Sequence, residues 1–295
     1  MLDPRLRTLL RNTTMHADMI HFGQGERLFV ALRARRMFRN GDGLLQQFIS
    51  SELRPDLDVT AIIPARNEAE TVGTVVRECL DYAGKVIVVE GGSKDRTAQE
   101  AAEAGAIVVR DKGRGKGAAL KEAVAHVTTK ICVFVDADGS HDPIDIPILV
   151  APIKTGIADH VTGSRLLGGS DELHGGGDEF LRLAGSAFIT YMINRRYGTR
   201  LSDSQNGFRA IRTELFRKLD LSSQHTTIEM EMIMATLALG HRIAEVPTHE
   251  LPRAAGYSKI SLSNPLIWTS YGWRLIAGLC RRRSTNNKLT DETSV

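Results

Sequence analysis

From Asp58 onward, short apolar runs alternate with segments of helical periodicity, and this alternation restricts the fold more than any other feature of the 295-residue chain. The apolar runs predict buried strands at residues 59–63, 85–89, 107–109 and 131–135. Apolar residues at helical spacing predict helices at residues 71–80, 96–104 and 118–127. Because helices of this length join parallel strands by right-handed crossovers, we expect an α/β protein with a mainly parallel central sheet flanked by helices.

The pattern continues less regularly after Pro152. Further strands are predicted at residues 160–162, 208–211 and 242–246, and further helices at 178–196 and 228–239. Glycines between residues 168 and 177 predict a mobile loop, of a kind that often closes over a substrate. We expect four parts: an N-terminal helical extension (1–57), a core domain (58–260), an amphipathic C-terminal helix (261–283) and a flexible tail (284–295).

Composition excludes several protein classes. With 42% hydrophobic and 25% charged residues, the chain has the balance of a folded globular protein. The three cysteines (Cys79, Cys132 and Cys280) are scattered without CxxC spacing, which argues against a disulfide framework and a thiolate zinc site. The sequence shows neither a secretory signal nor an apolar stretch of about 18 residues, so we expect a cytoplasmic protein.

The formal net charge of +3 conceals an uneven distribution. Residues 1–39 hold eight basic residues against three acids, residues 40–252 hold 23 against 30, and residues 253–290 hold seven and no acid. Basic ends of this kind predict an anionic substrate or surface, such as the inner face of a membrane. No RNA- or DNA-binding motif accompanies them, so we expect no nucleic-acid partner.

The most informative motif runs from a predicted strand directly into two carboxylates, Asp136 and Asp138. Ligands of open α/β sheets bind beyond the carboxyl ends of strands. Mg²⁺ and Mn²⁺ bind one or two carboxylates together with phosphate oxygens, so the pair predicts a divalent cation on a diphosphate. A polar turn that merely ends the strand is the alternative, since Asp and Gly are common in turns.

Three other segments carry suitable chemistry at strand ends: residues 64–68, 90–95 and 113–117. Acidic side chains there can accept hydrogen bonds from a ribose or a base. Glycines before Lys116, at a predicted helix start, would let backbone N–H groups approach phosphates. Four strand ends of this kind favour a nucleotide site over four unrelated turns.

The ordered set VTAIIPARNEAETVGTVV, VVEGGSKDRT, GRGKGAAL, FVDADGSHDP, TGSRL, DSQNGFRAIR and RAAGYSKIS resembles the family 2 glycosyltransferases of the GT-A fold. Within that family it is most similar to the polyprenyl-phosphate (dolichol-phosphate) mannose synthase-like branch. The resemblance covers about residues 58–262. It implies a nucleotide-sugar donor, Mg²⁺ or Mn²⁺ as cofactor and a polyprenyl-phosphate acceptor.

The resemblance also implies roles for individual residues. The nucleotide-sugar would be bound by Pro64, Arg66, Glu68, Glu90, Ser93, Lys116, Asp136, Ala137 and Asp138. The metal would be held by Asp136 and Asp138, with Ser140 at the family's third, often Gln, position. Arg165 and Arg209 would lie on the acceptor side, and the catalytic group would comprise Asp203, Arg253 and Lys259. The chain departs from the family where Glu90-Gly91-Gly92-Ser93 replaces the usual Asp-Asp-Gly-Ser.

Two acceptors remain open on the sequence. In an inverting transfer to a lipid phosphate, which is mostly ionised at neutral pH, no general base is required. A soluble enzyme that glycosylates a hydroxyl of a small molecule or glycan would need one. Asp203 is then the candidate, with Glu229 or Glu231 behind it, although these two glutamates also fit a polar helix face.

The predicted C-terminal helix also allows two readings. It carries tryptophans on an apolar face and ends in three arginines, which fits a helix lying in a bilayer interface. It equally fits a helix packed on the core. A sugar nucleotidyltransferase would share the layout, but its glycine-rich loop is missing after the first strand, where Pro64-Ala65-Arg66-Asn67 stands.

Overall fold

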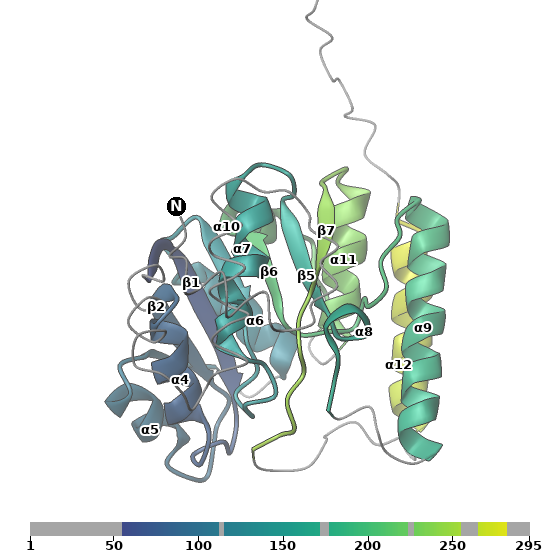
Figure 1. The fold of residues 1–295 in the computed structure, drawn as a ribbon. Coiled ribbons are helices and arrows are strands. Elements are labelled where there is room, and N and C mark those ends of the chain that lie inside the picture. Colours follow the sequence, from purple (N-terminus) through teal and green to yellow (C-terminus); the bar gives the residue numbers. More distant parts are fainter. Residues whose placement is uncertain (1–54, 112–114, 172–176, 224–226, 255–264, 282–295) are drawn as a thin grey trace, which may run out of the picture.

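The computed structural model describes residues 55–111, 115–171, 177–223, 227–254 and 265–281. Its centre is a seven-stranded sheet in the order β3-β2-β1-β4-β6-β5-β7 (Figure 1). The strands are β1 (Asp56–Ala65), β2 (Ala83–Glu90), β3 (Ile107–Arg110), β4 (Ile131–Phe134), β5 (His160–Ser164), β6 (Arg209–Arg212) and β7 (Ile243–Pro247).

The sheet is mainly parallel, as the alternation of strands and helices predicts. β1 pairs in parallel with β2 and β4, β2 with β3, and β5 with β7. The exception is β6, which runs antiparallel to both of its neighbours, β4 and β5. A parallel run of β2-β1-β4 brings the carboxyl ends of three strands to one edge of the sheet, where ligands of α/β proteins bind.

Helices cover both faces of the sheet. Their bounds are α4 (Val72–Leu80), α5 (Thr97–Glu103), α6 (Lys116–Ala125), α7 (Ile146–Lys154), α8 (Arg165–Gly168), α10 (Thr213–Lys218) and α11 (Ile228–Ala238), with a 3₁₀ turn at Pro143–Asp145. Successive side chains of a strand point to opposite faces. Ala61 and Ile63 therefore pack in the core with α4 and α7, while Ile62 packs with α6, α10 and α11.

Two further helices, α9 (Gly177–Tyr197) and α12 (Pro265–Leu279), lie side by side beyond the β7 edge of the sheet (Figure 1). They join α11 in a third apolar cluster. The two helices run in the same direction, because Tyr197 Oη donates to the carbonyl of Gly278 at 2.8 Å and Arg196 Nε donates to that of Leu279 at 2.8 Å. The predicted C-terminal helix thus contacts the body of the protein along one side.

Several predicted parts lie outside the described residues: most of the N-terminal extension (1–54), the tail (282–295), residues 172–176 of the glycine-rich segment and the stretch 255–264 that contains Lys259. In the described part of the chain, no helix has the length and apolar character needed to cross a bilayer.

Candidate active site

The loops after β1 and β2 are joined to each other by hydrogen bonds from main-chain N–H groups to side-chain oxygens. The N–H of Asn67 donates to Ser93 Oγ at 2.9 Å, and the N–H of Lys94 donates back to Asn67 Oδ1 at 2.8 Å. The N–H of Glu68 donates to Thr97 Oγ1 at 2.9 Å. The two loops thus form one unit, which carries the residues predicted to bind the nucleotide: Pro64, Arg66, Glu68, Glu90 and Ser93.

Asn67 has a positive φ of 56°, a conformation that asparagine tolerates better than most residues. Glu90 is buried at the end of β2, and its carboxylate accepts the N–H of Ser93. The carboxylate of Glu90 therefore stabilises the turn of the Glu90-Gly91-Gly92-Ser93 segment to which it belongs. Gly91 follows the edge of β1, since its N–H donates to the carbonyl of Ala65 at 3.0 Å.

Lys116, the first residue of α6, connects two carboxylates from different parts of the chain. Its Nζ lies 2.6 Å from Asp136 Oδ1, after β4, and 2.8 Å from Glu229 Oε1, in the first turn of α11. Burial would raise the pKa of Asp136, but the charge of Lys116 outweighs it and holds the pKa well below the usual range. Burial would likewise lower the pKa of Lys116, but its two carboxylates raise it. Lys116 and Asp136 thus both favour their charged forms.

Gly207 is the residue that leaves room for this cluster. A Cβ at this position would lie 2.9 Å from Lys116 Nζ and 3.1 Å from Asp136 Oδ2. Such separations are shorter than normal contacts, so a side chain would displace the Lys116–Asp136 pair. The glycine of the Gly207-Phe208-Arg209 segment therefore serves a close approach rather than a turn.

The segment after β7 brings Arg253 to the second carboxylate of the motif. The N–H of Leu251 donates to the carbonyl of Ser140 at 2.8 Å, and that of Ala254 donates to the carbonyl of Asp138 at 3.0 Å. With its backbone held this way, Arg253 Nη1 lies 3.2 Å from Asp138 Oδ2. Ser140 Oγ and N–H both donate to Asp138 Oδ1, at 2.7 and 3.1 Å. Ser140 thus orients the carboxylate.

His141 contacts the loop after β4 that carries Asp136 and Asp138. Its ring stacks on that of Phe208, with the centroids 4.9 Å apart, and its Nδ1 accepts the N–H of Asp136 at 3.1 Å. Burial lowers the pKa of His141, more than the neighbouring Asp136 raises it, and this favours the neutral ring that such an acceptor needs. Sequence reasoning assigned no role to His141, although it stands at the end of the quoted FVDADGSH segment.

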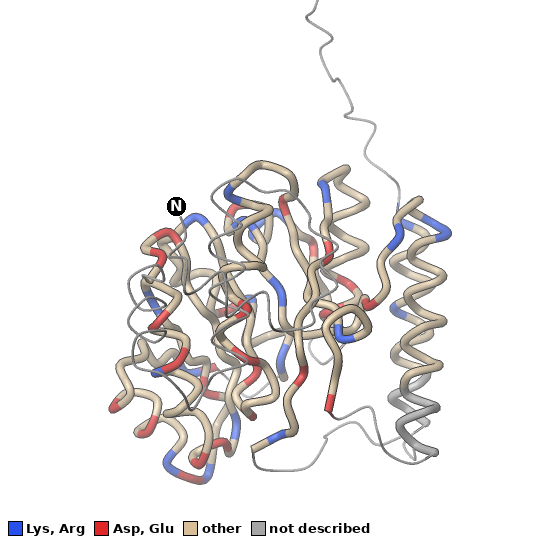
Figure 2. Tube along the Cα trace, viewed as in Figure 1, with Lys and Arg blue, Asp and Glu red and all other residues tan. Residues whose placement is uncertain are grey.

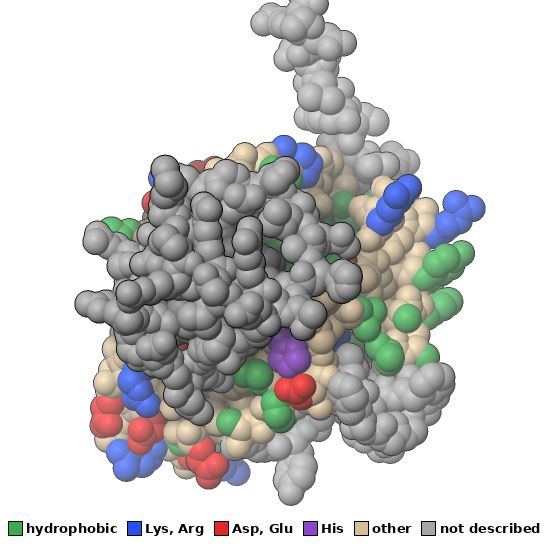
Figure 3. Space-filling view, viewed as in Figure 1, with side chains coloured by type: hydrophobic (Ala, Val, Ile, Leu, Met, Phe, Trp, Pro, Cys, Tyr) green, Lys and Arg blue, Asp and Glu red, His purple; other side chains and the backbone are tan. Residues whose placement is uncertain are grey.

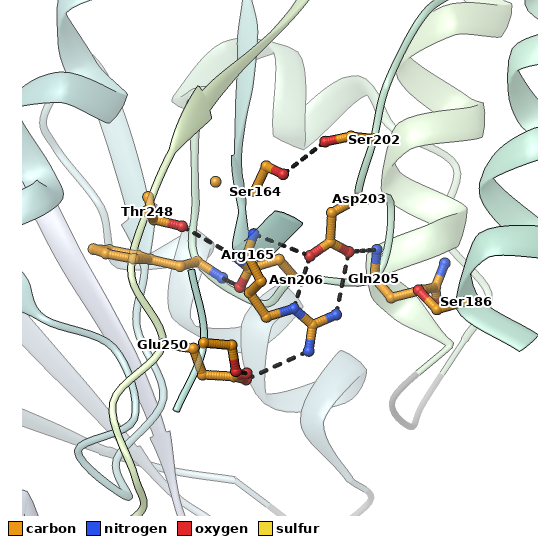
Figure 4. Close-up of polar contacts among 12 residues, drawn as sticks. Ser164, Arg165, Ser186, Ser202, Asp203, Gln205, Asn206, Thr248 and Glu250 are labelled. Carbon is orange, nitrogen blue, oxygen red and sulfur yellow. Dashed lines mark hydrogen bonds and ion pairs between the residues drawn. The ribbon is translucent and has the colours of Figure 1, made fainter. Parts of the chain in front are cut away.

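On the other side of the site, Arg165 joins Asp203 to Glu250 (Figure 4). Arg165 Nε lies 2.7 Å from Asp203 Oδ2 and Nη2 lies 3.1 Å from Oδ1, so the pair is bidentate. Nη1 of the same guanidinium lies 3.4 Å from Glu250 Oε1. Burial would raise the pKa of Asp203, but Arg165 and the N–H of Gln205 outweigh it and lower the pKa. Glu250 had no place in the sequence-based site.

Arg209 lies beneath the site rather than on its surface, with 1% of its area exposed. Its guanidinium donates to the carbonyl of Asn206 and, at 2.8 Å, to that of Glu229. Ala137 is also buried. Glu231 accepts three hydrogen bonds from Ser222 and Ser223 and pairs with Arg281 at 3.2 Å, so it fixes a loop and the end of α12.

The structure thus brings together Lys116, Asp136, Asp138, Ser140 and Arg253, and places Arg165 and Asp203 as a pair beside them. Sequence reasoning did not connect Glu229 with Lys116, because the two are 113 positions apart and carry no shared motif. An acidic residue at a helix start is a common stabilising feature, and the sequence holds no signal that distinguishes Glu229 from that role.

Residues 60–220 match the family model for glycosyl transferase family 2. The chain belongs to this family. Haloferax volcanii glycosyltransferase AglJ is 33% identical over 238 residues, which cover 80% of this chain and 75% of the relative. An undecaprenyl-phosphate mannosyltransferase from Micrococcus luteus is 32% identical over 218 residues, covering 69% and 87% of the two chains. These relatives confirm that the protein is a glycosyltransferase and that it resembles the polyprenyl-phosphate branch of the family.

Among solved structures, glucosyl-3-phosphoglycerate synthase from Mycobacterium tuberculosis, in complex with Mn²⁺, UDP-glucose and phosphoglyceric acid, superposes on this family 2 glycosyltransferase with a TM-score of 0.60. The two are 22% identical, and the match covers 90% of this chain and 86% of the other. At this level of identity the comparison speaks for the fold alone. It confirms the predicted GT-A arrangement.

Proposed function

We propose that this protein is an inverting, metal-dependent hexosyltransferase that moves a sugar from a GDP- or UDP-linked donor to a polyprenyl phosphate at the cytoplasmic face of a membrane. The observation that carries the proposal is the convergence of Asp136, Asp138, Lys116 and Arg253 beside the joined loops after β1 and β2. Two carboxylates and two cations at the end of a parallel sheet suit a nucleotide diphosphate. Lys259 remains predicted for the same phosphate-binding role as Arg253.

The residues present fit a divalent cation. In the described part of the chain no three His, Cys, Asp or Glu side chains form a cluster that could hold a metal. Asp136 and Asp138 nevertheless supply two hard oxygen donors, and each carboxylate is paired with a cationic side chain. Bound to these carboxylates and the donor, Mg²⁺ or Mn²⁺ would neutralise charge on the leaving diphosphate. Arg253 would add a second positive charge at that diphosphate.

The state of Asp203 supports a phosphate acceptor over a hydroxyl acceptor. A general base needs a free oxygen and a pKa near the working pH. Both oxygens of Asp203 are bound by Arg165, the residue is buried, and its pKa is lowered. An ionised lipid phosphate requires no base at all, so a locked Asp203 is compatible with transfer to it.

Exposed apolar side chains on α9 and α12 support a position at the membrane. Trp273 on α12 is 72% exposed, and Phe188 and Tyr191 on α9 are 60% exposed. In Figure 3, hydrophobic side chains are visible over this part of the surface. Few charged residues interrupt the middle of either helix, and Arg195 and Arg196 lie in the last turn of α9 (Figure 2). Aromatic residues beside arginines are typical of helices that lie in an anionic bilayer interface.

The proposal is tested by incubating the full chain with radiolabelled GDP- and UDP-hexoses, Mg²⁺ or Mn²⁺, and phospholipid vesicles that contain polyprenyl phosphate. We expect label in the organic extract with one donor, loss of that label in EDTA, and a decrease of at least about 100-fold in Asp138→Asn. Asp58→Asn is the matched control, because Asp58 is a surface carboxylate that pairs with Lys130 near the start of β1, at the opposite end of the strand from the site. Its activity should equal that of the parent.

Two results would contradict parts of the proposal separately. Transfer to water-soluble hydroxyl acceptors without any lipid product would refute the polyprenyl-phosphate acceptor. Undiminished lipid glycosylation in EDTA would refute metal dependence.

A further inference from the structure

Lys116 occupies an electrostatically unusual place. It is the first residue of α6, and a cation at the N-terminus of a helix is disfavoured by the partial positive charge of the helix end. Its ammonium is held there by Asp136 at 2.6 Å and Glu229 at 2.8 Å, and only 19% of its side chain is exposed. Since Asp136 belongs to the carboxylate pair predicted to hold a divalent cation, Lys116 and that cation would compete for the same carboxylate.

Glu229 is the more deeply buried of the two partners, and it has an unused acceptor. Its Oε1 binds Lys116, whereas its Oε2 is buried without a hydrogen-bond partner among the described residues. A buried carboxylate oxygen without a donor is costly, and an ammonium has three N–H groups to offer. Gly207 leaves the space beside Lys116 Nζ free of a side chain. Lys116 can therefore exchange its bond to Asp136 for a second bond to Glu229 without losing a hydrogen bond.

We propose that Lys116 is the resident counter-ion of Asp136 in the donor-free enzyme, and that Glu229 is the positioning residue that retains Lys116 when Asp136 turns to the donor and its cation. This inference rests on the proposed nucleotide-sugar and metal dependence, and it is independent of the acceptor. Without the lysine, Asp136 and Glu229 would face each other as two uncompensated buried charges.

The exchange has a consequence for binding. A divalent cation alone meets a lysine that already neutralises Asp136, so its binding to the free enzyme is suppressed. A nucleotide diphosphate adds negative charge beside the lysine and lowers the repulsion between the two cations. Nucleotide and metal should therefore bind cooperatively, and the coupling should depend on Lys116 and, through it, on Glu229.

The test measures Mn²⁺ binding by electron paramagnetic resonance, with and without UDP or GDP, in the parent, Lys116→Met, Glu229→Gln and the double variant. In the parent, we expect the matching nucleotide to tighten Mn²⁺ binding by about tenfold or more. Lys116→Met should bind Mn²⁺ alone about tenfold more tightly and lose the coupling. Glu229→Gln should bind Mn²⁺ alone more weakly, because Lys116 is then held by Asp136 only.

The double variant separates positioning from a general charge effect. If Glu229 acts through Lys116, adding Glu229→Gln to Lys116→Met should leave the coupling unchanged. It also removes the charge of Glu229 together with that of Lys116, so it preserves the test where Lys116→Met alone unfolds. The exchange would be overturned if Glu229→Gln changed the nucleotide–Mn²⁺ coupling equally with and without Lys116. Parental coupling in Lys116→Met would overturn it as well. If the parent enzyme binds no Mn²⁺ in the presence of either UDP or GDP, this result would instead contradict the proposed donor and metal, and with them this inference.

Discussion

At the scale of single residues, the hydrogen bonds of the Asp203 carboxylate determine its chemical character. Arg165 binds both of its oxygens, and the N–H of Gln205 donates to Oδ1 at 3.0 Å. The N–H of Asp203 itself donates to Glu245 at 2.7 Å, which holds the backbone in place. A carboxylate with this many donors is a strong hydrogen-bond acceptor and a weak base. It holds Arg165, whose guanidinium also contacts Glu250.

We therefore predict that Asp203→Asn lowers stability while leaving the pH dependence of turnover intact. Removing one charge of a buried ion pair costs on the order of 3 kcal/mol, because the other charge remains without its partner. Thermal unfolding measures the loss, and the double variant Asp203→Asn with Arg165→Gln should recover part of it. A pH–rate profile is the second readout: disappearance of its acidic limb in Asp203→Asn would identify Asp203 as a general base.

At the scale of elements, the position of α12 depends on one close helix contact. A Cβ at Gly278 would lie 2.1 Å from Met234 Cε and 2.3 Å from its Sδ, on α11. At Gly272, six residues earlier on the same helix, an added Cβ would meet nothing within 4 Å. Of these two glycines in one helix, only Gly278 is required by packing.

Gly278→Ala should destabilise the protein by about 1–2 kcal/mol, since methionine is flexible enough to relieve part of the overlap. Gly272→Ala should be neutral or stabilise by up to about 1 kcal/mol, through better helix propensity alone. Thermal unfolding of the two variants under identical conditions gives the comparison. Equal melting temperatures would show that α12 is not held against α11 at Gly278.

The sequence predicts most elements because their local patterns agree with their final places. The early strands and helices lie within a few residues of their predicted bounds. The antiparallel direction of β6 carries no local signal, since the pattern of this four-residue strand, Arg-Ala-Ile-Arg, is the same in either direction. Helix α7 contains Pro147 and Pro152, which disguise its periodicity. Pro147 is tolerated because it stands in the first turn, where N–H groups have no helical partner.

At the scale of the whole molecule, part of the site follows from a local sequence pattern and part depends on the fold. The carboxylate pair could be found from sequence, because a strand that runs into two acids is a local pattern. The groups that surround those acids come from distant elements. Lys116 from α6 pairs with Asp136 and with Glu229 of α11, and Arg253 from the segment after β7 pairs with Asp138. Only the fold brings these groups together, so their roles could not be derived from spacing.

The stability of the whole fold should depend on a buried histidine in the strand β5. His160 is fully buried between the sheet and α11, where its Nδ1 lies 3.0 Å from Thr236 Oγ1. Its Nε2 has no partner among the described residues. Burial, followed by the charge of Arg209, lowers its pKa well below the usual value. The native state therefore holds a neutral imidazole.

Acidification should therefore destabilise the protein from about pH 6.5 downward. Above that pH, His160 is neutral in both the folded and the unfolded chain, and its full contribution to stability is present. Below it, the unfolded chain binds a proton that the folded chain does not, which costs up to about 1.4 kcal/mol per pH unit. His141, whose pKa is also lowered by burial, adds to the slope in the same direction. The carboxylates with lowered pKa titrate in the unfolded chain near pH 4, outside this window.

Melting temperatures at pH 7.5, 6.5 and 5.5 measure this dependence. We expect the decrease between pH 6.5 and 5.5 to be smaller in His160→Gln than in the parent, because one of the groups that gains a proton on unfolding is gone. His126→Gln is the matched control for the substitution itself, because it replaces an exposed histidine at the end of α6. If His160→Gln keeps the parental slope, the imidazole is not the group that couples stability to pH, and a different proton acceptor must become available when this fold opens.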